Sequence, residues 1–389
     1  MMTTKKIRRY DLDWVRVMVF GLLIIYHVGM FFVEWGWHVK NNELYAWLQW
    51  PMAFVNRWRL PILFVISGMG TYYALSYRNW KQFVWERNKR LGIPLIFGML
   101  LIVPPQVYFE RLADGDFTGP LVDFFSTVAY TGVYPEGNLS WHHLWFLPYL
   151  LIYSVLLAPL FIYWRRNPEN KFLNWVKRLL HKPERLFLFI IPLYLTEALM
   201  EPFFPVTHAL VNDWFALVNF IILFLYGFLL LSCGEVFWKA LDKIKKKALI
   251  LGVLSFITLV VLWQFEDGVL RHFIEAGVAV LNLWAWILAI MGYAATYRSK
   301  PSKWLAYANR AVYPFYILHQ TITVTIAYYI KDLEWGFIPK FLVLGLGTFL
   351  GCWVIYDLII LRISFLHPVF GLKKQVYKEH QLPVTSTDK

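Results

Sequence analysis

The sequence predicts an all-α, polytopic membrane protein with about ten transmembrane helices and both termini on the cytoplasmic side. Composition is the first reason: 59% of the 389 residues are apolar and 16% are charged, against about 45–50% and 25% in soluble proteins. So few charged side chains cannot cover the surface of a water-soluble globule, which excludes an ordinary soluble enzyme and a disordered chain. The second reason is the recurrence of long apolar runs, and the third is the distribution of lysine and arginine between them.

Ten segments have the length of about 20 mostly apolar residues that a membrane-spanning helix needs. They are residues 12–33, 56–77, 91–109, 143–164, 185–202, 213–234, 248–265, 273–296, 311–330 and 338–361. We expect residues 1–370 to form a single transmembrane domain, and residues 371–389 to form a short polar tail in the cytoplasm.

The basic residues alternate between the loops in the way that orients a protein in a membrane. With the N-terminus inside, the cytoplasmic segments hold 30 of the 38 lysines and arginines, and the outer segments hold seven. Cytoplasmic loops of membrane proteins carry such an excess. An odd number of spans would have put the basic cluster of one end outside. The net charge of +13 therefore reflects orientation in a lipid bilayer and gives no reason to expect a nucleic-acid partner.

Two ionisable residues lie on the first predicted span. Arg16 and His27 are 11 residues apart, which places them on one helix face, about 16 Å apart along the axis. We expect Arg16 near the cytoplasmic surface and His27 near or beyond the middle of the membrane. Ionisable residues inside spans are functional candidates. Taken singly, each also has a structural interpretation: Arg16 extends to the interface, and His27 is a satisfied helix contact.

Two further spans begin with arginines. Arg59 stands at the outer end of the second span, followed by Ser67-Gly68, a small pair that lets a helix or a ligand approach closely. Arg87 and Arg90 enter the third span at its cytoplasmic end, three residues apart and therefore neighbours on a helix. The amide groups and dipole of a helix N-terminus favour anions. The pair is a candidate anion site, and the alternative is ordinary positive charge at the cytoplasmic surface.

Histidines and aromatic residues mark two later spans. His143 and Trp145 open the fourth span at the outer face, where aromatic side chains commonly form an interfacial belt. His319 is a second intramembrane imidazole, on the ninth span. The adjacent His142 and His143 point to different faces of a helix, and no metal-binding spacing such as HExxH occurs. We therefore expect no metal ion and no bound cofactor.

Taken in order, these stretches resemble the membrane acyltransferase 3 family over most of the chain, from Asp13 to about Gln320. The family's first motif is matched by Arg16 and His27, and its third by Arg87, Arg90 and Pro94. Its second motif is matched by Leu63-Phe64-Val65-Ile66-Ser67-Gly68, in which Leu63 replaces a phenylalanine. A run that begins at His143 and another that ends at Gln320 are also similar to family segments. Each motif is short, but together their order and their places in the spans are specific. Within the family, the sequence is most similar to the periplasmic glucan succinyltransferase subgroup.

The resemblance implies a multi-pass enzyme of the bacterial inner membrane. Such an enzyme moves an acyl group, acetyl or succinyl, from cytoplasmic acyl-CoA to a hydroxyl of an extracytoplasmic or lipid-linked glycan. Arg16, Arg87 and Arg90 would then hold the phosphates of the acyl-CoA donor. His27, with Arg16, is the expected catalytic residue, either as the general base toward the hydroxyl or as the carrier of the acyl group.

Several residues remain as candidates for stabilising the oxyanion or holding the acceptor. They are Arg59, Ser67, Gly68, His143, Trp145 and His319. The main alternative function is a secondary transporter, which usually contains repeated halves; we see no internal repeat. A further alternative is a membrane protein that binds acyl-CoA without transferring the acyl group. The sequence leaves open the oligomeric state, a dimer included, and the need for a partner protein.

Overall fold

The computed structural model describes residues 9–298 and 300–372, and all regular structure within them is helical. This confirms the predicted all-α fold; within these residues the nearest approach to a sheet is one isolated bridge between Val133 and Leu139. The α-helices are α1 (Tyr10–Met30), α2 (Gln49–Ala74), α3 (Trp80–Arg87), α4 (Ile93–Phe97), α5 (Pro104–Asp114), α6 (Leu121–Thr127), α7 (Phe146–Arg166), α8 (Lys171–Leu180), α9 (Ile190–Leu199), α10 (Trp214–Ser232), α11 (Glu235–Leu262), α12 (Val269–Tyr297), α13 (Lys303–Ile330) and α14 (Phe337–Val354). The 3₁₀ and π segments are η1 (Ala46–Leu48), η2 (Asn88–Gly92), η3 (Gly98–Ile102), η4 (His142–Trp145), η5 (Pro183–Phe189), η6 (Ile355–Ile360) and η7 (Ser364–Leu366).

Among the described residues, six helical segments are long and apolar enough to cross a membrane. They are Tyr10–Met30, Trp80–Asp114, His142–Arg166, Trp214–Ser232, Val269–Tyr297 and Phe337–Ile360. The other four predicted spans also fall on helices, but α2, α11 and α13 hold more polar or charged residues, and α9 is short. The count of ten spans and the cytoplasmic side of both termini therefore stay predictions. Residues 373–389 of the predicted polar tail lie outside the described residues.

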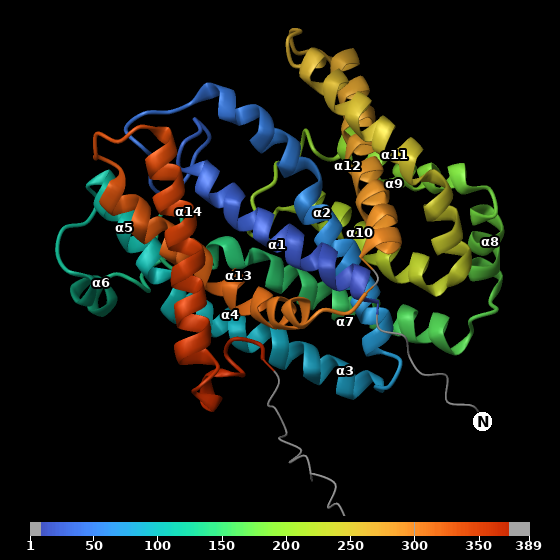
Figure 1. The fold of residues 1–389 in the computed structure, drawn as a ribbon, viewed down its shortest axis with the longest axis horizontal. Coiled ribbons are helices and arrows are strands. Elements are labelled where there is room, and N and C mark those ends of the chain that lie inside the picture. The colour runs from blue at the N-terminus through green and yellow to red at the C-terminus, as the bar shows by residue number, and fades with distance from the viewer. Residues whose placement is uncertain (1–8, 299, 373–389) are drawn as a thin grey trace, which may run out of the picture.

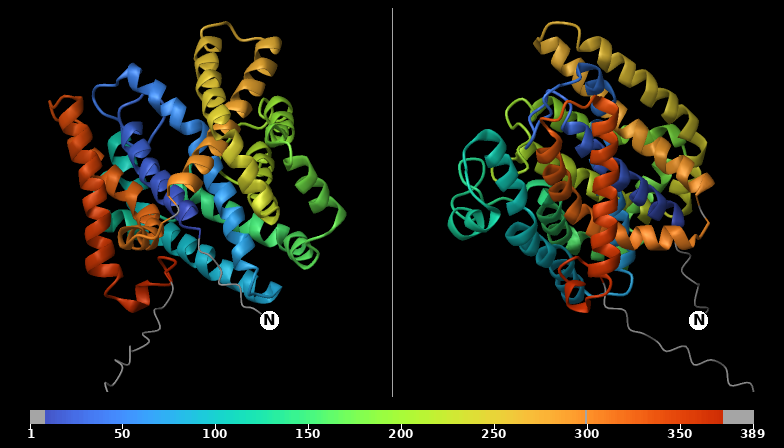
Figure 2. Two further views of the ribbon diagram at one scale, coloured as in Figure 1. Left: turned by 45° about the vertical axis from the view of Figure 1, so that its right-hand side comes forward. Right: turned by 60° about the vertical axis from the view of Figure 1, so that its left-hand side comes forward.

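Helix α1 lies in the middle of the molecule and contacts α2, α12, α13 and α14 (Figure 1). In the left view of Figure 2 it runs between α14 at one edge and α8 at the opposite edge. Asp11 and Asp13 stand in its first turn, where carboxylates interact favourably with the helix dipole. Because no proline interrupts the helix, α1 holds Arg16 and His27 on one regular face, as their spacing predicts.

The third predicted span is part of one continuous helical stretch, Trp80–Asp114. Two π turns interrupt it, η2 and η3, and each is followed within two residues by a proline, Pro94 and Pro104. Proline has no amide hydrogen to donate, so the hydrogen-bond pattern of the helix must change at these positions. Single π turns are frequent at functional sites, and η2 carries Arg90 just after Arg87 at the end of α3.

Helices α2 and α10 cross so closely that their backbones touch at two glycines. A Cβ atom on Gly68 would collide with the carbonyl oxygen of Phe224, and one on Gly227 would collide with the carbonyl oxygen of Val65. Small residues permit such close contact between helices in a membrane. Gly68, which the sequence marks as a candidate site residue, therefore has a packing role against α10.

Replacing Gly227 by alanine is expected to destabilise the protein, because the added methyl group must push the two helix backbones apart. Overpacked sites of this kind cost about 1–3 kcal/mol. The measurement is the apparent melting temperature of the purified protein in detergent, which we expect to fall by several degrees. Gly21→Ala on α1 is the matched control, since nothing lies within 4 Å of the added Cβ. Equal melting of the two variants would contradict the close crossing.

Candidate active site

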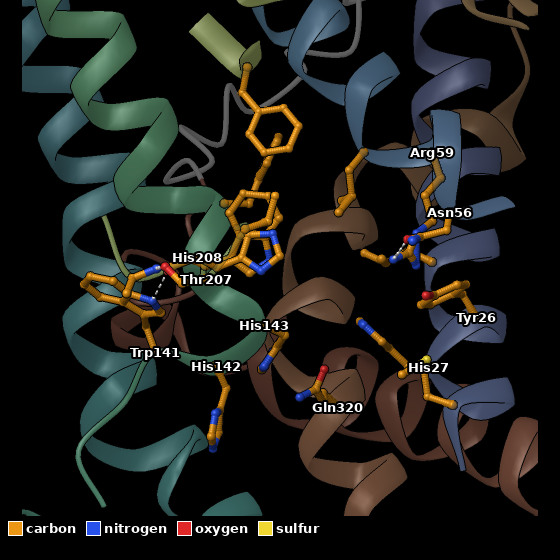
Figure 3. Close-up of a pocket in the computed structure, with 18 of the residues that line it drawn as sticks. Tyr26, His27, Asn56, Arg59, Trp141, His142, His143, Thr207, His208 and Gln320 are labelled. Carbon is orange, nitrogen blue, oxygen red and sulfur yellow. Dashed lines mark hydrogen bonds between the residues drawn. The ribbon is translucent and has the colours of Figure 1, made fainter. Parts of the chain in front are cut away.

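A cavity of about 1130 Å³ lies between α1, α2, α7, α10, α12 and α13 and is also lined by the loops at 133–141 and 206–209. Four of the predicted site residues line it: His27, Arg59, His143 and Trp145. Figure 3 shows His27 and Arg59 on one side of this space and Trp141 on the other. The cavity therefore joins residues that are far apart in the sequence and that belong to separate motifs.

His27 forms a hydrogen-bonded pair with His319, the other predicted intramembrane imidazole. His27 Nδ1 lies 2.7 Å from His319 Nε2, and the two rings are stacked with centroids 4.9 Å apart. The second nitrogen of His319, Nδ1, lies 2.8 Å from the carbonyl oxygen of Tyr316 and 3.2 Å from that of Phe315. His319 is fully buried, so its environment is set by these contacts.

These contacts determine where the protons of the neutral pair lie. A carbonyl oxygen only accepts hydrogen bonds, so His319 Nδ1 carries a proton and donates it to the backbone. His319 Nε2 then has a lone pair and accepts a hydrogen bond from the N–H group at His27 Nδ1. His27 Nε2 is left with its lone pair and has no hydrogen-bond partner among the described residues, while its ring lines the cavity. The arrangement presents a base, or a nucleophile, to whatever occupies the cavity.

Arg59 places a buried cation on the same side of the cavity. Its guanidinium carbon lies 3.2 Å from the centre of the Tyr26 ring, the residue next to His27, and its Nη2 donates to Asn56 Oδ1 at 3.1 Å. The Nε and Nη1 groups are buried and have no hydrogen-bond partner among the described residues. Buried donors are nearly always paired, so two unpaired guanidinium nitrogens in a cavity lining indicate a site for a negatively charged or carbonyl oxygen.

His143 has a structural role in this arrangement. Its Nε2 donates to the carbonyl oxygen of Ile317 at 3.1 Å, and its Nδ1 lies 3.4 Å from Gln106 Nε2. The Tyr316 hydroxyl donates to the carbonyl oxygen of His143 at 2.6 Å. Both ring nitrogens are therefore engaged, and the side chain ties the start of the fourth span to α13. The ring of His143 also packs edge-to-face against the ring of His319, with centroids 5.1 Å apart.

Trp145 forms an aromatic wall with His208, whose ring is stacked on it with centroids 3.8 Å apart. The loop that carries His208 is organised by Asp213, which accepts from the backbone amides of Thr207 and His208. Trp141 Nε1 donates to the carbonyl oxygen of His208 at 2.9 Å. Burial lowers the pKa of His208 to about 4, so the ring is neutral at physiological pH. The wall is thus uncharged and suited to stacking.

The arginines predicted to bind the donor lie elsewhere, at the other end of α1 and outside the cavity lining. Arg16 donates to Asn309 Oδ1 at 3.3 Å, and its Nη2 lies about 4 Å from the position of a Cβ on Gly70. Arg87 Nη2 lies 3.4 Å from Oγ1 of the neighbouring Thr71. The two guanidinium groups therefore lie at neighbouring residues of α2, Gly70 and Thr71, and Arg16 Nη1 also lies 3.7 Å from the carboxylate of Asp13.

Arg87 and Arg90 differ in their surroundings. The Nε of Arg87 is buried and has no hydrogen-bond partner among the described residues. Arg90 lies 3.6 Å from Glu86, and 45% of its side chain is exposed. Glu86 also binds Arg78 at 3.1 Å. Of Arg87 and Arg90, Arg87 is therefore the one with a buried N–H group that has no partner among the described residues.

Ser67 lies outside the cavity lining, as does Gly68. The backbone carbonyl of Ser67 accepts from the hydroxyl of Thr71, within α2, at 3.0 Å. This segment thus supports the turn at which Arg16 and Arg87 meet. The role of Ser67 in stabilising an oxyanion stays a prediction without support from this geometry.

Sequence reasoning missed several polar residues around the cavity. Asn56 fixes Arg59, while Gln320 joins His38 to Gln106 through hydrogen bonds of 2.8 and 3.1 Å. His38 also contacts Glu110, which is buried. Asn56 and Arg59 are three residues apart on one helix, but the contacts of Gln320 and His38 have no spacing signal, because their partners are 72 to 282 positions away. One signal could have found these residues: they are polar side chains in or next to predicted spans, and this chain has few polar residues there.

Comparison with known proteins places the chain in a family. Residues 9–357 match the acyltransferase domain that defines the Acyl_transf_3 family. The chain belongs to the acyltransferase 3 family. This confirms the resemblance drawn from the motifs, and the protein is accordingly an acyltransferase.

Curated relatives of this acyltransferase share its whole length. The glucans biosynthesis protein C of Escherichia coli strain K12 is 25% identical over 389 residues, covering 96% of this chain and 97% of the relative. The protein of the same name from Shigella dysenteriae serotype 1 is 25% identical over 391 residues with the same coverage. No solved structure matches the chain significantly. Because six helical segments of the described residues are long and apolar enough to cross a membrane, the acyltransferase is a membrane protein.

Proposed function

We propose that this acyltransferase moves an acetyl or succinyl group from cytoplasmic acyl-CoA to a hydroxyl of an extracytoplasmic or lipid-linked glycan, in the inner membrane of a bacterium. The names of the full-length relatives support a glucan or a related glycan as the acceptor. The observation that carries the proposal is the His27–His319 pair, which leaves the basic Nε2 of His27 exposed to the cavity.

The donor end of the proposed reaction is the arginine pair formed by Arg16 and Arg87. Acyl-CoA carries phosphates, and guanidinium groups bind phosphate by short, charge-assisted hydrogen bonds. Arg16 lies about 16 Å along α1 from His27, so a donor with its phosphates at this end needs an extended arm to bring its thioester to the imidazole. The pantetheine arm of CoA is such an extended chain.

The acceptor end of the proposed reaction is the cavity. It offers two features to a sugar: the aromatic wall of Trp145 and His208, and the charged pair of Arg57 and Glu197. Arg57 lies 3.9 Å from both Glu197 and Glu275, and Arg57 and Glu197 line the cavity. Sugars are held by aromatic faces together with charged hydrogen-bonding groups, because their rings have apolar faces and polar edges. This combination supports a glycan as the acceptor.

The transfer step breaks the thioester C–S bond and forms an ester C–O bond. His27 Nε2 can take the proton of the attacking hydroxyl, and this proton then neutralises the departing CoA thiolate. In the second route, His27 Nε2 attacks the thioester first and the CoA thiolate leaves; the hydroxyl then displaces the imidazole from the acyl-imidazole, and its proton neutralises the thiolate. Both routes use the same lone pair. In both, the unpaired N–H groups of Arg59 are suited to stabilise the oxyanion.

Replacing Arg87 by glutamine is expected to raise the KM for acyl-CoA about tenfold, because a charge-assisted contact to phosphate contributes about 1.5–3 kcal/mol. The increase should be larger at low salt than at high salt, since salt screens charges. Steady-state kinetics at two salt concentrations measures it. Arg90→Gln is the matched control, and we expect less than about a threefold change because that side chain is paired and exposed. Equal effects of both substitutions would remove Arg87 as a specific donor ligand.

The experiment that tests the function uses the purified full-length protein in lipid nanodiscs. Acyl-CoA with a radiolabelled acetyl or succinyl group is supplied with an oligomeric glucan, and the label on the glucan is counted after separation. We expect label to appear on the glucan with one of the two donors and free CoA to be released in equal amount. Donor binding without release of CoA or label on any acceptor would instead support a transporter or an acyl-CoA-binding protein.

A further inference from the structure

Three side chains from three separate segments converge beside the cavity. His38 lies in the loop between α1 and α2, Glu110 lies on α5, and His142 begins η4. One ring nitrogen of each histidine and one carboxylate oxygen of Glu110 all lie within 4.8 Å of one another. Two imidazoles and a carboxylate with an open fourth position are the ligand set of many catalytic zinc sites.

Each of the three side chains is also held from behind, through the atom that faces away from the cluster. The Tyr134 hydroxyl donates to Glu110 Oε1 at 2.8 Å, and His142 Nδ1 lies 3.3 Å from Ser140 Oγ. His38 Nε2 lies 2.8 Å from Gln320 Nε2, an amide nitrogen that donates, so in this arrangement the proton of a neutral His38 lies on Nδ1. Ligands of metal ions are typically oriented by outer hydrogen bonds of this kind.

His142 provides a second, independent indication of a ligand. Its Nε2 is buried and has no hydrogen-bond partner among the described residues, although its ring lies against His38 with centroids 4.5 Å apart. Its backbone has a positive φ of 39°, a conformation that costs free energy for a residue with a side chain. A strained backbone that aims an unpaired imidazole nitrogen at a histidine–carboxylate pair needs a reason, and a bound cation supplies one.

We propose that His38 Nδ1, Glu110 Oε2 and His142 Nε2 bind a divalent transition-metal ion, with zinc as the best fit. Imidazole ligands favour zinc, copper, iron or nickel over magnesium and calcium. Binding requires the direct contact between His38 Nδ1 and Glu110 Oε2 to open, because ligand atoms at about 2.0–2.1 Å from a tetrahedral ion are about 3.3 Å apart. It also requires the proton of His38 to move from Nδ1 to Nε2, with the amide of Gln320 turned so that its oxygen accepts from Nε2. His38 and His142 line the cavity, so the fourth coordination position faces the space proposed for the acceptor.

The position of the ion suggests a role in acyl transfer, and this role rests on the proposed function. A metal ion with an open position binds a hydroxyl oxygen and lowers its pKa. Gln320, which contacts His38, directly follows His319, the partner of His27. The ion would therefore hold an acceptor hydroxyl at the end of the cavity that is connected to the basic imidazole. The hydroxyl proton would still pass to His27 Nε2.

The test measures metal content and needs neither donor nor acceptor, so its failure leaves the proposed function standing. The full-length protein is purified in detergent through a tag without histidines, and its metals are quantified by inductively coupled plasma mass spectrometry. We expect about one zinc ion per chain, falling below roughly a fifth in Glu110→Gln and His142→Ala. His208→Ala is the matched control, since His208 also lines the cavity but lies outside the cluster, and it should keep the ion.

Replacing the bound metal by cobalt tests the site in the wild-type protein, without relying on the variants. After removal of the metal and loading with Co²⁺, the wild-type protein should show the intense visible absorption bands of a four-coordinate site with nitrogen and oxygen ligands. Wild-type protein that retains neither zinc nor cobalt after desalting would overturn the proposal. So would the weak spectrum of six-coordinate surface ions, or folded Glu110→Gln and His142→Ala proteins that keep the full metal content.

Discussion

Replacing His27 by glutamine is expected to lower the turnover number for acyl transfer by about a thousandfold, the typical contribution of a positioned base or nucleophile. Glutamine has a similar reach and can still hydrogen-bond to His319, but it offers no basic nitrogen to the cavity. The measurement is the initial rate of CoA release by the purified protein with saturating donor and acceptor. The expected fall in turnover number with little change in donor KM would indicate a group that acts in the transition state.

The control for this substitution is His272→Gln. His272 is a partly buried histidine whose Nε2 contacts the carbonyl oxygen of Ala198, and it lies outside the cavity lining. We expect it to keep the wild-type rate within about twofold, as distant polar changes usually do. A folded His27→Gln protein with more than about a tenth of the wild-type rate would remove His27 from the chemistry.

Replacing Arg59 by glutamine is expected to lower the turnover number by about 10²–10³-fold, the effect of losing an oxyanion donor. The two buried N–H groups of Arg59 that have no partner among the described residues are the reason, since they can pair with the oxygen that becomes negative during transfer. Kinetics with wild-type and variant protein measure the loss. The Arg59→Lys variant should recover only part of the rate, because an ammonium group cannot reproduce the planar guanidinium.

Arg57→Gln is the matched control for the substitution at Arg59. Arg57 lines the same cavity but is paired with Glu197 and Glu275 at 3.9 Å each. We expect this change to act on the KM for the acceptor and to leave the turnover number within about fivefold. An unchanged turnover number in folded Arg59→Gln protein would assign oxyanion stabilisation to another group.

Most of the helical architecture was predictable from the sequence, since each predicted span falls on a helix. The number of membrane crossings was harder to predict from the sequence, for a physical reason. Helices α2 and α13 carry polar residues, among them Arg59, His319 and Gln320, that line the cavity or support it. These residues lower the hydropathy of their helices. The candidate site residues themselves therefore weaken the signal from which spans are counted.

The site was predictable in part. The spacing of Arg16 and His27 correctly placed both on one regular helix, and His319 was singled out as a candidate site residue. The hydrogen bond between His27 and His319 was not predictable, because the two residues are 292 positions apart and no local pattern encodes the crossing of α1 and α13. The spacing rule for metal sites likewise found nothing at His142, since the residues that surround it come from distant segments.

At Gly68, the sequence pattern was visible but had two possible meanings. A Ser-Gly pair within a span fits both a ligand contact and a close helix crossing, and the sequence gives no means to choose. The reciprocal contact with Gly227 of α10 shows that Gly68 is needed for packing. Its place in a family motif can thus follow from the shape of the helical assembly that positions Arg59 on the same helix.

The central claim is that the protein transfers an acyl group to a glycan through His27, and mass spectrometry of cell-envelope glycans tests it most directly. Glycans are extracted from cells that produce the wild-type protein, the His27→Gln variant at equal abundance in the membrane, or neither. We expect a glycan with the mass increment of an acetyl or succinyl ester, removed by mild alkali, only in cells with the wild-type protein. Identical glycan spectra from the wild-type and His27→Gln cells would contradict the account.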